Sequence, residues 1–236
     1  MSFADRFFDE PAGGQYRELV GITTHLAPAD LALYRHFLPE SLGLPARPTV
    51  TIFMVDYIKV VPWPMDRYQE WSVLLLSSYR GRDAWYPVAM RQTSWVPMKR
   101  SRDLGFPIHQ VDKVDLSKGG DTITGAAMHK GALQLELLFQ AGHSRPLAAW
   151  ETELADNEAF FKGGYHCLVP PGVGLRVLKV DLMHVVPAKW APQHGMVAVR
   201  ADPRSSWAGL LPQEGPFPGT YNRFVGGYNM VAKRLA

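Results

Sequence analysis

Two side chains in the first half of the chain, Glu70 and His109, have the chemistry to move protons on a small molecule. Imidazole titrates near neutral pH, and both imidazole and carboxyl groups transfer protons to or from a carbonyl or an enol. On facing strands, the two residues would form an acid–base pair. The structural alternative is that His109 donates to a backbone carbonyl and Glu70 pairs with an arginine such as Arg91. The sequence leaves both interpretations open.

The rest of the chain has no standard catalytic motif, and we expect no metal site and no cofactor. The glycine-rich nucleotide-binding motifs, HExxH and GxSxG are all missing. Cys167 is the one cysteine, which excludes an internal disulfide and a multi-cysteine metal site. Adjacent strand residues point to opposite faces, so His166 does not activate Cys167, which we expect to be a buried structural thiol.

Segments of strand length, separated by glycine and proline, dominate the chain and predict a turn-rich β protein. Gly131, between two extended runs, predicts a hairpin, and Gly81 allows a second one earlier in the chain. The predicted strands cover residues 19–25, 49–61, 70–79, 85–95, 108–116, 122–128, 132–141 and 177–187.

Few helices are expected. One begins at residues 28–30, has apolar residues at helical spacing, and ends at Pro39. Shorter helices are predicted over residues 203–211, with Asp202 as N-cap, and over residues 221–235. Many consecutive strands with a few peripheral helices predict an α+β, mostly β fold whose antiparallel sheet is curved or closed.

Composition indicates one folded domain over residues 1–236. Hydrophobic residues make up 47% and charged residues 20% of the chain, which excludes a disordered protein. The apolar runs are far shorter than the roughly 20 residues that cross a bilayer, and no secretory signal is recognisable, so we expect a cytoplasmic protein that does not bind membranes. The net charge of +3 is scattered and forms no basic stripe for nucleic acid.

Five short motifs, in the same order, resemble those of the acetoacetate decarboxylase family. Residues 68–70 are similar to its Tyr-x-Glu strand, and residues 85–90 to its Met-containing strand. Residues 101–109 are similar to its Gly-Arg-Glu and Gly-Phe-Pro-Lys-Lys elements. Residues 37–42 and 165–170 are similar to its Val-Pro-Glu-Pro-Leu and Asn-Tyr-x-Leu-Lys-x-x-Pro segments. The resemblance therefore spans nearly the whole chain.

The resemblance implies a cone-shaped antiparallel β-barrel whose interior is the substrate pocket, in a protein that forms homo-oligomers. Glu70 then corresponds to the family's pocket glutamate, and Arg17 lies near its carboxylate-binding arginine. Phe106 and Met90 are the candidates for lining the pocket. Arg102 is a second candidate for holding a substrate carboxylate, and its alternative role is a structural ion pair with Asp103 or an oligomer contact.

The chain departs from the family at the catalytic lysine pair, where it has Ile108 and His109. The family condenses a lysine amine with a ketone, and the protonated imine accepts the electrons released when CO₂ leaves. Neither isoleucine nor imidazole forms that imine. Lys113 lies roughly 13 Å further along an extended strand, and Lys99 is also too distant, whereas Lys59 stays open as a substitute.

We therefore expect an enzyme that acts on a carbonyl-bearing, enolisable small molecule by acid–base catalysis without a Schiff base. The reaction type, whether lyase, hydratase or cyclase, stays open. Two alternatives remain: a non-catalytic small-molecule-binding barrel, and a true decarboxylase that uses a relocated lysine such as Lys59.

Overall fold

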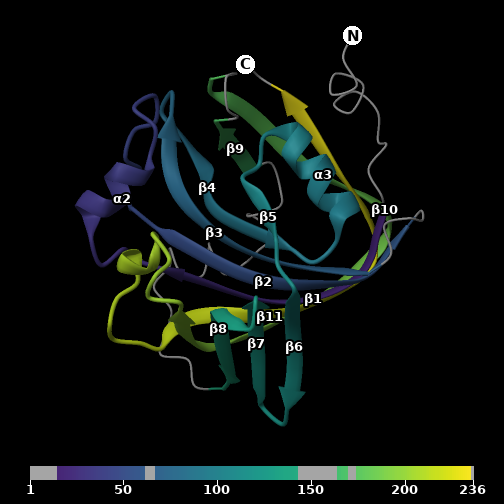
Figure 1. Ribbon diagram of the computed structural model, residues 1–236. Helices are drawn as coiled ribbons and strands as arrows, with labels where there is room; N and C mark the ends of the chain where they lie inside the picture. The colour runs from purple at the N-terminus through teal and green to yellow at the C-terminus, as the bar shows by residue number, and fades with distance from the viewer. Residues whose placement is uncertain (1–14, 62–66, 143–163, 170–173, 235–236) are drawn as a thin grey trace.

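A curved sheet of eleven strands forms the body of the protein in the computed structural model (Figure 1). The structure describes residues 15–61, 67–142, 164–169 and 174–234. Neighbouring strands follow the order β11-β1-β2-β3-β4-β9-β10-β8-β7-β6, and β5 pairs with β4 outside this path. The mostly β architecture predicted from the turn-rich sequence is therefore confirmed.

Seven of the predicted strands correspond to the first eight strands along the chain, because the strand predicted over residues 108–116 is divided into two, and the eighth corresponds to part of a later strand. The strands are β1 (Gln15–Leu26), β2 (Val50–Val61), β3 (Tyr68–Tyr79), β4 (Arg82–Gln92), β5 (Ile108–Gln110), β6 (Lys113–Gly119), β7 (Thr122–His129), β8 (Ala132–Ala141), β9 (Gly164–Leu168), β10 (Arg176–Ala201) and β11 (Phe217–Arg234).

Both predicted hairpins form, and each turn uses a residue pair with positive φ. Arg80 and Gly81, with φ of 50° and 75°, connect β3 to β4. Lys130 and Gly131, with φ of 50° and 73°, connect β7 to β8. These left-handed conformations match the twist of antiparallel strands, and glycine adopts them without a steric penalty.

The helix predicted after Pro28 is confirmed as α2 (Leu31–Phe37), where the Asp30 side chain accepts a hydrogen bond from the Leu33 backbone N–H at 2.9 Å. A second helix, α3 (Trp95–Leu104), lies where the sequence predicted only the end of a strand and a loop. It ends at Gly105, whose φ of 106° is a left-handed helix cap. Within the described ranges, no helix has the length and apolar character needed to cross a membrane.

Two helix predictions near the C-terminus are wrong. Residues 221–235 were expected to be helical, but β11 runs through them to Arg234. Burial there follows the two-residue period of a strand, since Asn222 and Phe224 are buried while Arg223 and Val225 are exposed. Of the helix predicted over residues 203–211, only one 3-10 turn, η1 (Ala208–Leu210), forms.

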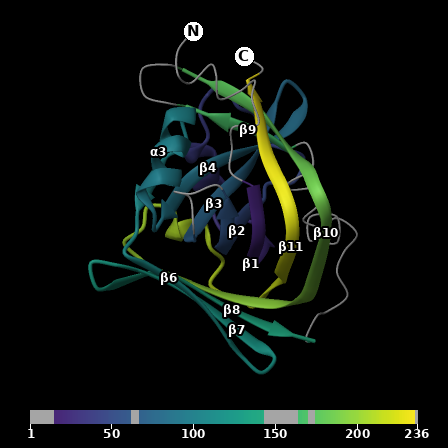
Figure 2. The same cartoon turned by 90° about the vertical axis from the view of Figure 1, so that its right-hand side faces the viewer.

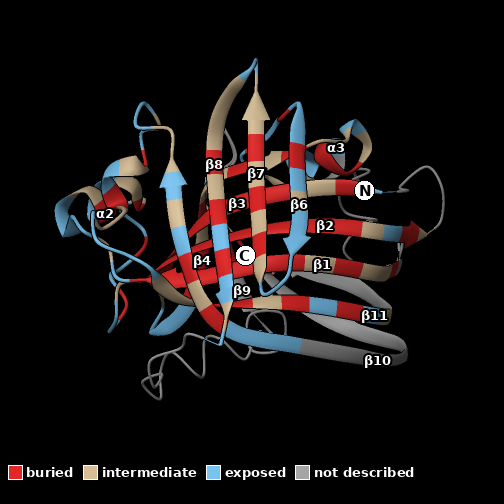
Figure 3. Ribbon diagram, turned by 90° about the horizontal axis from the view of Figure 1, so that it is seen from below, coloured by how far each residue is buried: buried red, intermediate tan, exposed pale blue. Residues whose placement is uncertain are grey.

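The curved part of the sheet has two faces with different coverings. Its outer face is covered by β6, β7 and β8, which run across β1–β4 (Figure 3). Aliphatic and aromatic side chains such as Ile52, Met54 and Trp71 fill this junction. The inner face lies within the curve of β1–β4, β10 and β11 (Figure 2), and it carries Phe53, Tyr57 and other buried aromatic residues. Strand alternation thus separates a structural core from a second buried surface.

The closed cone-shaped barrel implied by the family resemblance is not confirmed. Besides the main strand path, β10 pairs along its length with β11. On the other side of the curve, one bridge, between Trp85 and His166, joins β4 to β9. The structure supports a strongly curved, mostly β fold with few helices, and closure of the barrel stays a prediction.

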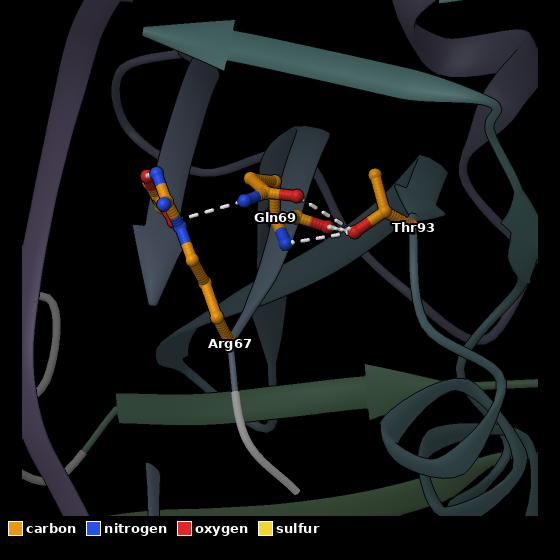
Figure 4. A network of polar contacts seen from close by, with 4 residues as sticks. Arg67, Gln69 and Thr93 are labelled. Atoms are coloured by element: carbon orange, nitrogen blue, oxygen red, sulfur yellow. Dashed lines mark hydrogen bonds and ion pairs between the residues drawn. The ribbon is translucent and has the colours of Figure 1, made fainter. Parts of the chain in front are cut away.

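A polar network at the edge of the outer face fixes the start of β3 (Figure 4). Asp56 is buried, and it accepts hydrogen bonds from Arg67 Nε at 3.0 Å and from Gln69 Nε2 at 3.1 Å. Thr93 Oγ1 donates to Gln69 Oε1 at 2.9 Å. The network ties β2, β3 and the end of β4 together on the outer side. Because Gln69 is held there, the next residue, Glu70, is directed to the inner face.

Candidate active site

The inner face differs from the outer core in its content of buried polar side chains. By register and by their packing with the inner aromatic residues, these side chains belong to β1, β2, β3, β4, β9 and β11. Burying so many polar groups on one surface is costly unless they are hydrogen-bonded, so such a surface is typical of a binding site. They are Thr23, His25, Thr51, Glu70, Ser72, Gln92, His166, Thr220 and Asn222.

Glu70 is the carboxylate at the centre of this surface. Glu70 is 5% exposed, and Ser72 Oγ donates a hydrogen bond to Glu70 Oε1 at 3.1 Å. The Gln92 side-chain Nε2 donates to its other oxygen. Burial raises the pKa of the Glu70 carboxyl from 4.5 to about 7, although the hydrogen bonds from Gln92 and Ser72 act in the opposite direction. A carboxyl with this pKa exchanges protons efficiently at neutral pH.

Gln92 is the direct cross-strand partner of Glu70 in the β3–β4 hairpin. Because Nε2 faces the carboxylate, the amide oxygen faces away, and among the described residues this buried oxygen has no hydrogen-bond partner. Glu70 and Gln92 belong to a row of cross-strand neighbours, which continues across the sheet through Val55, Gly21 and Asn222. At its far end the Asn222 Oδ1 atom is likewise buried and unpartnered within the described part of the chain. The row therefore presents unused acceptors on both sides of Glu70.

Three tyrosines form an aromatic wall beside Glu70. Tyr57 and Tyr68 stack with ring centroids 4.5 Å apart, and Tyr16 lies 5.1 Å from Tyr57. The hydroxyls of Tyr16 and Tyr68 are 3.3 Å apart. Burial, together with Tyr16, Tyr57 and Glu70, raises the pKa of Tyr68 well above its ordinary value. The Tyr68 hydroxyl therefore stays protonated, and the wall supplies apolar surface and hydrogen-bonding hydroxyls.

Ile108 occupies the inward-facing position of the segment where the resemblance predicts two lysines. It is 1% exposed and packs with Met90, Met98 and Phe106. Met90 pairs with Ile108 in the parallel β4–β5 bridge, so the two share one face. The expected pocket-lining residues Met90 and Phe106 therefore lie together, around a side chain that has no amine.

His109 does not lie beside Glu70. Its bridge partner is Arg91, which is itself opposite Trp71 on the outer face, whereas Glu70 and Gln92 face inward. The His109 side chain is exposed, and its pKa is lowered by partial burial and by the nearby cations Arg91 and Arg102. The acid–base pair expected from the sequence is therefore not assembled, because the strand alternation separates its members.

The two predicted carboxylate-binding arginines also lie apart from Glu70. Arg102 is exposed on α3, where its Nε donates to the Ile108 carbonyl at 2.7 Å and its guanidinium lies 6.0 Å from the Trp95 ring. Its sequence neighbour Asp103 pairs with Lys99 at 2.9 Å instead. Arg17 lies at a bulge of β1 and lines a surface pocket with Lys59.

His166 joins the inner face, and sequence analysis gave it no role there. Its ring meets Phe106 edge-on at 6.0 Å, and its bridge partner Trp85 also faces inward. Burial lowers the pKa of His166 to about 4, so the imidazole is neutral at physiological pH. Cys167, on the opposite face, packs with Leu42 and Val177, and burial raises its pKa to about 12. This agrees with the expected inert thiol.

The sequence of residues 13–171 matches the family model described as acetoacetate decarboxylase (ADC). The chain belongs to the acetoacetate decarboxylase family. The match covers every motif on which the resemblance was based. No curated protein sequence matches the chain.

Solved structures of the acetoacetate decarboxylase fold are similar over nearly the whole chain. Acetoacetate decarboxylase from Legionella pneumophila has a TM-score of 0.71 at 18% identity, covering 100% of this chain and 96% of that one. Another acetoacetate decarboxylase structure has a TM-score of 0.74 at 14% identity, with 95% and 89% covered. The enduracididine biosynthesis enzyme MppR, complexed with pyruvate, gives 0.66 at 16%, with 94% and 90% covered. At these identities the likeness establishes the fold.

The candidate site of this family member contains a carboxyl with a pKa of about 7, Glu70, and a buried neutral imidazole, His166. Among the described residues, no group of three or more histidine, cysteine or acidic side chains is arranged to hold a metal ion. What the described residues offer is proton transfer by Glu70, beside neutral hydrogen-bonding groups and aromatic surface.

Proposed function

We propose that this protein is an enzyme that acts on a carbonyl-bearing, enolisable small molecule by acid–base catalysis at Glu70, without a Schiff base. The single observation that carries the proposal is the buried Glu70 carboxyl, held by Ser72 and Gln92 and tuned to a pKa of about 7. Perturbed carboxyls of this kind on a buried polar surface are typical of catalytic acids and bases.

The proposed step is proton transfer at the carbon next to the carbonyl. Ionised Glu70 takes a proton from that carbon, and the C–H electron pair moves toward the carbonyl to give an enol or enolate. The carboxylic acid so formed then returns the proton to carbon or to oxygen. Ser72 and Gln92 hold the carboxylate in one orientation throughout, which lowers the cost of reorganisation during the transfer.

Ile108 supports a mechanism without an imine step. An imine requires a primary amine on the inner face, and the inward-facing residue of the segment corresponding to the family's lysine pair is an aliphatic side chain. Among the residues whose burial the structure describes, the buried polar ones also include no lysine. Electrons released at the substrate must then be held as an enolate rather than by an iminium group.

Deuterium exchange tests this proposal without a known substrate. A panel of β-keto acids, 1,3-diketones and α-keto acids is incubated with the protein in D₂O, and NMR follows deuterium incorporation next to the carbonyl. We expect exchange above the buffer rate for at least one member. Binding of a panel compound with no exchange would instead favour the alternative of a non-catalytic small-molecule-binding protein.

His109→Ala gives a prediction that separates the two residues singled out in the sequence. Because His109 lies on the opposite face from Glu70, we expect the exchange rate to change by less than about threefold. If this variant lost exchange at unchanged ligand affinity, His109 would be a catalytic residue and the assignment to Glu70 alone would be wrong.

A decarboxylase with a relocated lysine is the second candidate, and one observation favours it. Lys59 lines the same surface pocket as Arg17, so an amine and a carboxylate-binding group lie close together. Lys59 is exposed, however, whereas a lysine that forms an imine is activated by desolvation in an apolar pocket or by a neighbouring cation. We also propose that the protein assembles into a homo-oligomer. Light scattering, which gives the mass of the particle in solution, tests this.

A further inference from the structure

Gln92 carries an unused hydrogen-bond acceptor beside the proposed catalytic base. The residue is 2% exposed and lies directly opposite Glu70 in the β3–β4 hairpin, where its Nε2 donates to the carboxylate. An ionised carboxylate only accepts hydrogen bonds, so this contact determines which way the amide points and leaves Gln92 Oε1 on the other side. Among the described residues, no group donates to this buried oxygen.

A buried amide oxygen without a donor is unfavourable, because it has lost its hydrogen bonds to water and gained none in the protein. The contact with Glu70 accounts for the amide nitrogen of Gln92 and leaves the oxygen without a partner. A molecule bound at the inner face removes this cost if it donates a hydrogen bond to Gln92 Oε1.

The far end of the same row repeats this pattern at Asn222. Asn222 is 4% exposed, and its Nδ2 donates to Thr220 Oγ1 at 3.0 Å, while its Oδ1 has no partner in the described part of the chain. Both unused atoms are acceptors, and ionised Glu70 accepts as well. Among the residues whose burial the structure describes, the buried polar ones include neither lysine nor arginine. The row therefore favours a molecule that brings hydrogen-bond donors.

The position of Gln92 specifies where the donor lies on the substrate. The amide oxygen and nitrogen are bonded to one carbon, so Gln92 Oε1 lies within about 5 Å of the Glu70 oxygen that Nε2 contacts. A carbon that gives its proton to Glu70 is then close enough for its own substituent to reach Gln92.

We propose that the substrate carries a hydroxyl or amino group on its enolisable carbon and that this group donates to Gln92 Oε1. This inference rests on the proposed function, since it takes Glu70 to act on that carbon. Gln92 is then a specificity-determining residue, because an analogue without the donor leaves a buried acceptor unpaired.

The ketones 2-hydroxyacetophenone and propiophenone test this inference, since they differ only by a hydroxyl in place of a methyl on the single enolisable carbon. NMR titration at pH 8, where Glu70 is ionised, gives the dissociation constant of each ketone. We expect the wild-type protein to bind 2-hydroxyacetophenone roughly tenfold more tightly. Gln92→Met keeps the length of the side chain and removes the acceptor, so the preference should disappear or reverse.

Ser72→Ala is the matched control, because it removes the other hydrogen bond to Glu70 and leaves the Gln92 amide in place. It should change both affinities alike and keep their ratio, whereas Gln92→Met should change the ratio. Circular dichroism checks that both variants fold, and the wild-type ratio is decisive even if Gln92→Met does not.

Three results would overturn the inference. They are no binding of 2-hydroxyacetophenone at millimolar concentration, equal or tighter wild-type binding of propiophenone, and a preference for the hydroxyl that persists in Gln92→Met. Deuterium exchange at the enolisable carbon of the same ketones reports separately on the proposed function. A preference that depends on Gln92, without exchange, would retain the donor recognition and contradict the catalytic role of Glu70.

Discussion

Replacing Glu70 by glutamine is expected to lower the rate of substrate deuterium exchange by about 10²–10⁴-fold, the usual contribution of a positioned general base. Glutamine keeps the size of the side chain and its contacts with Ser72 and Gln92 but has no site that takes a proton from carbon. In the wild type, the rate should rise with pH through about 7, since the ionised carboxyl is the base.

Glu214→Gln provides the matched control, because Glu214 is exposed and is not one of the buried polar residues of the inner face. It should retain the wild-type rate and pH profile. Ligand affinity should stay within a few fold in both variants, so the loss in Glu70→Gln belongs to the rate and not to binding. Unchanged exchange in Glu70→Gln would remove Glu70 from the mechanism.

The same variant is expected to change how stability depends on pH. The pKa of Glu70 is about 7 in the folded protein, against the ordinary value of 4.5 that applies to the unfolded chain. The folded protein therefore holds the proton more tightly. The stabilisation from that proton is fully present below about pH 4.5, declines as the pH rises, and is lost above about pH 7. A shift of this size corresponds to roughly 3 kcal/mol in the free energy of unfolding.

Urea unfolding of wild type and Glu70→Gln between pH 4.5 and 8 measures this effect. The difference in free energy of unfolding, wild type minus variant, should fall by roughly 3 kcal/mol over this range and level off above about pH 7. His166 also titrates at acidic pH, because burial lowers its pKa to about 4, but it is present in both proteins and cancels in the difference. A difference independent of pH would mean that Glu70 is not buried as an ionisable group.

The sequence was sufficient to predict much of the sheet, because local signals determine the hairpins. Gly81 and Gly131 mark turns whose positive φ values are observed, and Asp30 caps the predicted helix. The C-terminal strand was missed because β11 pairs with β1 and β10, which are distant in sequence. Its apolar residues at short spacing suit a helix until those partners impose the two-residue period.

The candidate site was predicted in part. Glu70 was found by its motif, and its hairpin partner Gln92 was predictable in principle, since counting back from the turn at Gly81 places the two nearly opposite. The expected pairing of Glu70 with His109 failed because β5 pairs with β4 in parallel, and that register directs His109 outward and Ile108 inward. His166 was recognised only as the neighbour of Cys167, although the alternation that buries the thiol also directs the imidazole to the inner face.

Borohydride trapping with a β-keto acid shows whether the protein forms an imine with its substrate. The wild-type protein is incubated with acetoacetate and sodium borohydride, and its intact mass is compared with that of a sample without acetoacetate. If proton transfer at Glu70 operates without an imine, the mass stays unchanged under conditions in which deuterium exchange proceeds. A mass increase that saturates with acetoacetate and maps to a single lysine, Lys59 or any other, would show that an imine forms and that the mechanism proposed for Glu70 is wrong.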